Sequence, residues 1–503
     1  MKRITHWIDG RPWAGVAERT GKVFDPATGA QTKEVVFATE SEVNAAVTSA
    51  ASAFPRWKTT ALSKRASAMF RFRELLIEHL EEIAALVTSE HGKVKADARA
   101  EVERGLEVVE FACGITQLLK GEFTEHVSSG VNVHSLRQPL GVVAGITPFN
   151  FPSMVPLWMF PLAIACGNTF VLKPSEKDPS AALYLAELAT GAGIPSGVLN
   201  VVNGDAQVVE TLLAHPAIAA VSFVGSTSVA RHVYETAACH GKRVQALGGA
   251  KNHMVVLPDA DMGEAAEAAV SAGFGSAGER CMAVSVVVAV GGCGDLLIDR
   301  IRERVSRLVV GPGMQEASEM GPLVTAEHRA RVVSYLEIGS SEGAKIAIDG
   351  RDHPISGDPS GFWLGPCLLD DVSPGMRVYD DEIFGPVLSV VRVDTLDEAL
   401  ELIAGNRYGN GAAIFTRDGG AAQRFETEVK AGMVGINVSI PVPVANYSFG
   451  GWDSSLFGDL YVYGGDGVRF YTRGKAVTSR WREPYRGNLS LTFPSGEPTQ
   501  PVV

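Results

Sequence analysis

Residues 141–173 read GVVAGITPFNFPSMVPLWMFPLAIACGNTFVLK: a short apolar run, a helix-length apolar segment and a second short run. This rhythm continues to residue 247. The further short runs cover residues 198–202, 220–224 and 244–247, and helical segments cover 181–190, 206–214 and 229–238. Short strands that alternate with helices predict a doubly wound α/β unit with a mostly parallel sheet. Ligands of such a sheet bind at the carboxyl ends of its strands.

The flanking segments predict three further features. Apolar runs at 254–257, 285–290 and 387–393, with a helix over 396–404, predict a second α/β unit from about residue 255 to 445. Thr39-Glu-Ser-Glu42 has the form of a capping box and predicts a helix start there. The polar, β-leaning stretch 121–140 and the alternating stretch 469–481 predict a projecting hairpin and a late strand.

The composition limits the classes of function that the chain can have. The chain has 503 residues, 46% hydrophobic and 20% charged, which is typical of a globular protein of about three domains. Lys and Arg number 45 against 57 Asp and Glu, so the net charge of −12 disfavours a nucleic-acid partner. Six dispersed cysteines with no zinc spacing predict no metal site and a reducing, cytoplasmic location. We expect no signal peptide, and the apolar segment 151–167 holds three prolines, so it predicts a buried helix and not a membrane partner.

Two motifs carry groups suited to carbonyl chemistry. Cys281 lies in SAGERCMA, where the neighbouring Arg280 is expected to lower the thiol pKa and so favour the nucleophilic thiolate. An inert buried cysteine is an equally weighted alternative. Asn150 lies in TPFNFP, directly after an apolar run, where its amide could donate to a developing oxyanion. Taken alone, an asparagine in a turn explains that motif as well.

Two further motifs are suited to binding a nucleotide. LKPSE (172–176) and FVGST (223–227) each end a strand-like run, and the second opens a helix, whose N-terminus can hold a pyrophosphate. Neither motif is the G-x-G-x-x-G fingerprint of dinucleotide sites. EIFGP (382–386) places a carboxylate beside an aromatic ring, which could fix a ribose and a flat ring. Each signal is weak by itself.

Together and in this order, the motifs resemble the NAD(P)-dependent aldehyde dehydrogenase superfamily over nearly the whole chain. The matching stretches are TPFNFP, LKPSE, FVGST, LGGAKNH, GERCMA, EIFGP and GMVGIN. The resemblance implies a Rossmann-like NAD-binding domain, an α/β catalytic domain and a small β oligomerisation arm. We expect the NAD-binding domain at residues 1–120 and 141–250, the catalytic domain at 251–450, and the arm at 121–140 and 469–483.

The resemblance also implies roles for individual residues. Cys281 would attack an aldehyde, while Asn150 and the Cys281 backbone N–H hold the oxyanion. The cofactor-binding residues that it implies are Thr147, Phe149, Lys173, Glu176, Lys177, Gly225, Ser226, Gly248, Glu382 and Phe384. A carboxylate at Glu176 accepts a ribose 2′-hydroxyl but repels a 2′-phosphate, so NAD is favoured over NADP.

One departure from the family pattern bears on the product. Hydrolytic members carry a glutamate 34 positions before the cysteine, where this chain has Leu247, and a shift of one residue gives Ala246. Neither side chain can activate water as a general base. A thiol such as coenzyme A would not need that base. VQALGGAKNH, GERCMAVS, FGGWDSSLFGD and GVRFYTRGKAVTSRW resemble the CoA-acylating branch, the methylmalonate-semialdehyde dehydrogenases, which usually have Asn in place of Leu247.

That branch implies the reaction. It is the NAD-dependent, CoA-acylating oxidative decarboxylation of methylmalonate semialdehyde, or malonate semialdehyde, to propionyl-CoA or acetyl-CoA, by a homotetramer. Arg104 and Arg280 match the branch's carboxylate-binding positions, and guanidinium suits a carboxylate. The alternative for Arg104 is a helix-surface residue paired with Glu101 or Glu103. The alternatives for the chain are a hydrolytic aldehyde dehydrogenase that releases a carboxylic acid, and a protein of this fold without enzymatic activity.

Overall fold

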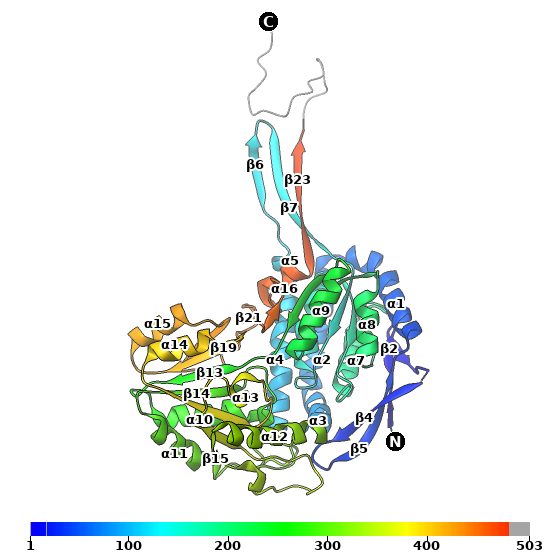
Figure 1. Ribbon diagram of the computed structural model, residues 1–503. Helices are drawn as coiled ribbons and strands as arrows, with labels where there is room; N and C mark the ends of the chain where they lie inside the picture. The colour runs from blue at the N-terminus through cyan, green and yellow to red at the C-terminus, as the bar shows by residue number, and fades with distance from the viewer. Residues whose placement is uncertain (1, 17, 482–503) are drawn as a thin grey trace.

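The computed structural model describes residues 2–16 and 18–481. Two α/β parts lie side by side, and a narrow arm of three strands projects from the first (Figure 1). Each α/β part is built on its own sheet. The loops of the candidate site follow the carboxyl ends of central strands in the first sheet and precede the amino ends of central strands in the second.

The first sheet has eight strands in the order β22-β12-β11-β8-β9-β10-β2-β3. Its five central strands are mutually parallel, as the sequence predicts, and these are β8 (Val142–Ile146), β9 (Thr169–Lys173), β10 (Leu199–Val201), β11 (Ile218–Val224) and β12 (Arg243–Leu247). Short antiparallel strands border them, namely β2 (His6–Ile8), β3 (Arg11–Trp13) and β22 (Leu456–Phe457). The sequence analysis did not find these border strands. It also missed the separate sheet β1-β5-β4, formed by Lys2–Ile4, Ala30–Phe37 and Arg19–Asp25.

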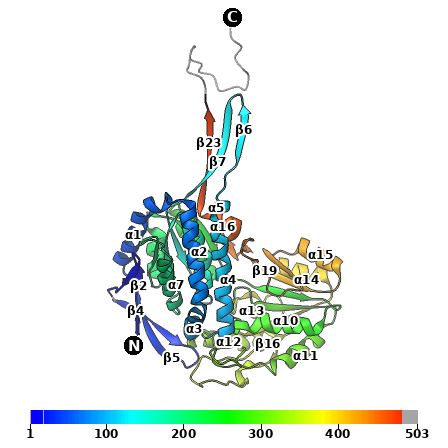
Figure 2. The same ribbon diagram turned by 180° about the vertical axis from the view of Figure 1, so that it is seen from behind.

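Helices cover both faces of this sheet (Figure 2). The crossover helices are α6 (Met154–Ala165), α7 (Ser180–Gly191), α8 (Ala206–Ala214) and α9 (Thr227–Cys239), and the N-terminal ones are α1 (Glu40–Lys58), α2 (Leu62–Glu78), α3 (Leu80–His91), α4 (Lys95–Cys113) and α5 (Ile115–Leu118). The capping box that starts α1 is confirmed, because the side chains of Thr39 and Glu42 accept reciprocally from each other's backbone N–H. Every residue of α6 is buried, and no helix among the described residues is long and apolar enough to cross a membrane.

The second sheet has seven strands, all parallel except at one edge. Their order is β15 (Lys345–Ile348), β16 (Cys367–Asp370), β17 (Val387–Val393), β14 (Val284–Val290), β13 (Asn252–Val256), β19 (Gly411–Phe415) and β20 (Met433–Ile436). Its helices are α10 (Met262–Phe274), α11 (Gly294–Val305), α12 (Ala326–Glu342), α13 (Arg377–Asp380), α14 (Leu396–Ala404) and α15 (Gly419–Glu428). The strand and helix predicted at 387–393 and 396–404 have the predicted bounds.

The arm consists of β6 (Phe123–Ser128), β7 (Val131–Pro139) and β23 (Thr472–Arg480), with β7 antiparallel to both neighbours (Figure 1). The late strand begins at Thr472 and not at residue 469, because α16 (Gly464–Phe470) extends to Phe470 and buries that side chain. Residues 482 and 483, which we assigned to the arm, lie outside the described residues.

Asn168 joins the base of the arm to the first α/β part. Its fully buried side chain accepts from the backbone N–H groups of Leu140 and Gly141, at 2.7 and 3.2 Å. It donates to the carbonyl oxygens of Ala163 and Tyr471, at 3.0 and 2.9 Å. One amide therefore ties the exit of β7, the end of α6 and the entry of β23.

We predict that Asn168→Ala lowers the free energy of unfolding by about 3 kcal/mol or more, since it leaves buried backbone groups without partners. Urea unfolding followed by circular dichroism measures the loss. Asn132→Ala is the control, because Asn132 accepts a single backbone bond, from the exposed His126, and we expect it to cost less than about 1 kcal/mol. Equal midpoints for the two variants would contradict this role of Asn168.

Candidate active site

A tight turn presents Cys281. The turn covers η1 (Gly275–Gly278), in which Ser276, Ala277 and Gly278 have φ values of 54°, 53° and 72°. A Cβ at Gly278 would lie 2.2 Å from the carbonyl oxygen of Gly385, so only glycine fits there. The turn therefore packs the Cys281 loop directly against the loop that follows Phe384.

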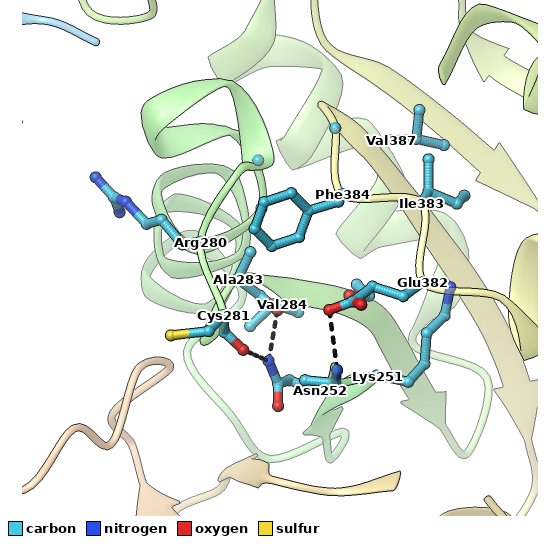
Figure 3. A pocket seen from close by; sticks show the side chains of 15 residues that line it. Lys251, Asn252, Arg280, Cys281, Ala283, Val284, Glu382, Ile383, Phe384 and Val387 are labelled. Carbon is cyan, nitrogen blue, oxygen red and sulfur yellow. Dashed lines mark hydrogen bonds between the residues drawn. The ribbon is translucent and has the colours of Figure 1, made fainter. Parts of the chain in front are cut away.

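Two asparagines fix the Cys281 peptide. The Asn252 side chain donates to the carbonyl oxygens of Cys281 and Ala283, both at 2.9 Å (Figure 3). The Asn410 side chain donates to the same Cys281 carbonyl at 3.1 Å. The sequence analysis missed both residues. Asn252 lies within the quoted stretch LGGAKNH, but Asn410 stands in no motif that could have pointed to it.

A cavity of about 800 Å³ opens beside Cys281, at the carboxyl ends of the strands in the first sheet. It brings together nine of the predicted site residues, namely Phe149, Asn150, Lys177, Gly225, Ser226, Gly248, Cys281, Glu382 and Phe384. They come from loops separated by more than two hundred residues of sequence. Asn150 is buried in the loop that follows β8, and it lines the same cavity as Cys281, so the candidate oxyanion donor and the candidate nucleophile lie together.

Thr147, Lys173 and Glu176 lie beyond the lining of this cavity, at the ends of β8 and β9. The Thr147 backbone N–H donates to the Lys173 carbonyl at 3.0 Å, and Lys173 forms an ion pair of 3.0 Å with Glu176. Burial opposes the charge of Glu176, but the Lys173 ammonium and hydrogen bonds lower its pKa overall. Lys177, the next residue, places its ammonium 4.5 Å from the centre of the Phe149 ring.

The N-terminus of α9 faces the cavity with open backbone donors. Ser226 precedes this 13-residue helix, lines the cavity and makes no side-chain cap bond. The helix dipole and the free N–H groups suit a pyrophosphate. Near this N-terminus, the Ala250 N–H donates to Glu382 at 2.9 Å, and a Cβ at Gly249 would lie 2.2 Å from the Glu382 carboxylate. These residues fit a dinucleotide, with an anion site at the helix N-terminus and a carboxylate for ribose hydroxyls near it.

The thiol of Cys281 is protonated at neutral pH in this arrangement. Burial above all, and then the charge of Glu382, raise its pKa to about 12, although the Cys281 and Met282 backbone N–H groups and Arg280 act to lower it. The expectation that Arg280 gives a low pKa is wrong. Its guanidinium diverges from the sulfur (Figure 3) and pairs with Asp97 at 2.8 Å. Burial also raises the pKa of Glu382, to about 6.

The two predicted carboxylate-binding arginines both have acidic partners. Arg104 is 46% exposed and contacts both carboxylate oxygens of Glu107 at 3.1 Å, so the alternative pairing with Glu101 or Glu103 is wrong. Arg104 and Tyr463 line the same small pocket. Burial and the charge of Cys281 raise the pKa of Tyr463, and the charge of Arg104 lowers it. The binding role of Arg104 stays a prediction.

Helix α12 holds the backbone of the Glu382 loop, which the sequence did not reveal. The His328 ring donates to the Phe384 carbonyl at 2.7 Å, and the Arg331 guanidinium donates to the Glu382 carbonyl at 2.7 Å. Behind them, the fully buried Glu279 lies 3.4 Å from His328, and burial raises the Glu279 pKa to about 8. These contacts join residues about fifty positions apart, so no local motif could indicate them.

The chain is similar to known proteins over nearly its whole length. Residues 13–477 match the family model described as the aldehyde dehydrogenase family. The malonate-semialdehyde dehydrogenase of Pseudomonas aeruginosa is 51% identical over 98% of this chain and 100% of its own length. Malonate-semialdehyde dehydrogenase 2 of Geobacillus thermodenitrificans is 50% identical over 95% of this chain and 99% of its own.

Two solved structures superpose closely. One is the methylmalonate-semialdehyde dehydrogenase of Oceanimonas doudoroffii, and the other is a Sinorhizobium meliloti protein in complex with NAD, provisionally described as a methylmalonate-semialdehyde dehydrogenase. Each has a TM-score of 0.95 and 52% identity, and each match covers 96% of this chain and 99% of the other. With a family model and relatives that span nearly its full length, the chain belongs to the aldehyde dehydrogenase family.

Proposed function

We propose that this chain is an NAD-dependent, CoA-acylating semialdehyde dehydrogenase. Its substrates would be methylmalonate semialdehyde and malonate semialdehyde, converted through a thioester on Cys281 to propionyl-CoA and acetyl-CoA. The names of the relatives support the substrate class, and the NAD complex of the Sinorhizobium protein supports the cofactor. The cavity beside Cys281, with its helix N-terminus and its ribose-suited carboxylate, supports the same cofactor.

The observation that carries the CoA-dependent reaction is the side chain at position 247. Leu247 is the last residue of β12 and is 97% buried, and its carbonyl accepts from the Gly225 N–H at 3.1 Å. An apolar side chain there cannot take a proton from water. A thioester on Cys281 therefore persists until a stronger nucleophile than water arrives, and a thiol is such a nucleophile.

Different residues of the chain take part in different steps of the proposed reaction. The Cys281 sulfur adds to the aldehyde carbon, while the Asn150 amide donates to the oxyanion that forms. When bound, NAD supplies the hydride acceptor for the oxidation that leaves the thioester. Loss of CO₂ from the β-carboxy thioester leaves an enolate, whose oxygen the Asn150 amide can hold while a proton adds to carbon. The CoA thiol then displaces the Cys281 sulfur.

Ligand binding at Glu382 would make the Cys281 thiol easier to ionise. The Glu382 charge opposes the Cys281 thiolate. Ribose hydroxyls that donate to this carboxylate would spread its charge and favour ionisation of Cys281. Arg104 and Arg280 would bind the substrate carboxylate. The substrate carboxylate would then have to compete with Glu107 for Arg104 and with Asp97 for Arg280.

We also propose a homotetramer in the cytoplasm. The arm supports assembly, because it projects from the α/β body and exposes the apolar side chains Phe123, Val127 and Leu136. The six unpaired cysteines support a reducing compartment.

A second candidate is a hydrolytic aldehyde dehydrogenase that releases a carboxylic acid. The pKa of about 6 for Glu382 favours it, since a carboxyl with a raised pKa could serve as the base that Leu247 cannot be. The two candidates differ in whether turnover needs CoA.

The need for CoA can be measured directly. With methylmalonate semialdehyde and NAD alone, we expect a burst of about one NADH per active Cys281 and then little turnover. Addition of CoA should give sustained NADH formation with propionyl-CoA as product. Cys281→Ser should abolish both the burst and the turnover. Equal sustained turnover without CoA would establish the hydrolytic candidate instead.

Glu176→Gln should shift the choice of cofactor. Since the lost charge no longer repels a 2′-phosphate, we expect the ratio of kcat/KM for NADP to that for NAD to rise by about tenfold. Steady-state kinetics with both cofactors measure the ratio. Glu187→Gln, the same change on the exposed face of α7, should leave it unchanged. An unaltered ratio in Glu176→Gln would show that the carboxylate does not select the cofactor.

Glu382→Gln should make Cys281 more reactive in the absence of NAD. Removal of a negative charge that raises the thiol pKa lowers that pKa, so we expect alkylation by iodoacetamide at pH 8 to accelerate by about threefold to tenfold. Mass spectrometry of the Cys281 peptide separates this reaction from that of the exposed Cys239. The control is Glu426→Gln on the exposed face of α15. A slower or equal rate in Glu382→Gln would refute the electrostatic coupling.

A further inference from the structure

A buried ion pair lies behind the cavity that holds Cys281 and Asn150. Lys93, between α3 and α4, and Glu101 on α4 are 2.7 Å apart, and neither side chain is exposed at all. Two charges lose much hydration free energy at such a site, and only good geometry with further hydrogen bonds compensates for that loss. The other partners of this pair therefore indicate its role.

Those partners lie in one short segment, residues 150–154. The Lys93 ammonium donates to the Asn150 carbonyl oxygen at 2.6 Å and lies 4.3 Å from the centre of the Phe151 ring. A single Glu101 oxygen accepts from the Ser153 N–H, the Ser153 hydroxyl and the Met154 N–H, at 2.8, 3.1 and 3.1 Å. The pair thus holds both ends of the segment that begins with the candidate oxyanion donor.

Glu101 also supplies the cap that α6 lacks. Ser153 precedes the helix but makes no side-chain cap bond, so its first N–H groups would be unpaired without this carboxylate from α4. The two helices approach closely, since a Cβ at Gly105 would lie 2.5 Å from Leu157. The segment 150–154 is therefore clamped to α4, and the charge of Glu101 complements the α6 dipole.

We propose that the Lys93–Glu101 pair positions the Asn150 amide for the oxyanion. The backbone carbonyl and the side chain of Asn150 leave the same Cα, so a fixed carbonyl limits the directions open to the amide. An oxyanion donor acts only when it is held at hydrogen-bond distance from the developing charge, and a displacement of about 1 Å costs about a hundredfold in rate. Lys93 and Glu101 are thus positioning residues, and the inference rests on the proposed role of Asn150 in aldehyde oxidation.

The decisive variant is Lys93→Met combined with Glu101→Gln. It removes both charges together, so no unpaired charge is left buried, and the glutamine oxygen can still accept from Ser153 and Met154. The hold on the Asn150 carbonyl is lost, together with the cation contact to the Phe151 ring. We expect kcat/KM for the semialdehyde to fall by about 30- to 100-fold, while the Kd for NAD changes by less than about twofold. The matched control is Lys95→Met with Glu81→Gln, the same exchange at an exposed pair of 2.7 Å, which should leave both values unchanged.

A double-mutant cycle separates positioning from a general structural effect. In an Asn150→Ala background, adding Lys93→Met and Glu101→Gln should lower kcat/KM by a further factor of less than about three. The reason is that the amide that the ion pair positions is already absent. A further loss as large as in the parent protein would overturn the proposal. Where the exchange unfolds the chain, Lys93→Arg, which keeps a positive charge beside Glu101 but displaces the donor to the Asn150 carbonyl, takes its place in the same cycle after a check for a native circular dichroism spectrum.

Failure of this inference is distinct from failure of the proposed function. If the parent protein forms no NADH from the semialdehyde, the proposed function is wrong, and the role of the pair falls with it. If the parent is active and Asn150→Ala is impaired at least about a hundredfold, but the exchange at Lys93 and Glu101 has no effect, only the positioning role is refuted.

Discussion

The closeness of two loops is the constraint on which the site depends. Gly278 can approach the Gly385 carbonyl only because it has no side chain, and this contact packs the Cys281 loop against the loop that carries Glu382, so that both residues line one pocket. The same closeness has an electrostatic cost, since burial and the Glu382 charge hold the thiol in its protonated form. A change that removes the Glu382 charge would lower the thiol pKa and favour its ionisation.

Much of the fold follows from local patterns in the sequence. The helices over 206–214 and 396–404 and the strand over 387–393 have the predicted bounds, because each is a run of apolar residues with a single period between clear breaks. The N-terminal strands over 2–37 were missed. Several are only three residues long and largely polar, so their pairing with distant strands, and not their own pattern, decides their conformation.

Site residues that stand in sequence motifs can be predicted from the sequence, but contacts made only in the tertiary structure cannot. Cys281, Asn150 and Glu382 stand in recognisable stretches, and all three line one cavity. The low pKa expected for Cys281 beside Arg280 was wrong, because adjacency in sequence says nothing about which way a side chain turns. Lys93 reaches the Asn150 carbonyl across 57 residues, and no local pattern indicates such a contact.

In the proposed reaction, Cys281 forms a thioester that persists until CoA arrives, because Leu247 cannot activate water. Intact-protein mass spectrometry tests this claim after incubation with methylmalonate semialdehyde and NAD, without CoA, and an acid quench. We expect one propionyl group per chain, located on the Cys281 peptide, stable over many minutes and removed on addition of CoA. An unmodified protein in the presence of accumulated NADH and free propionate would contradict the account, because it would mean that water completes the reaction despite Leu247.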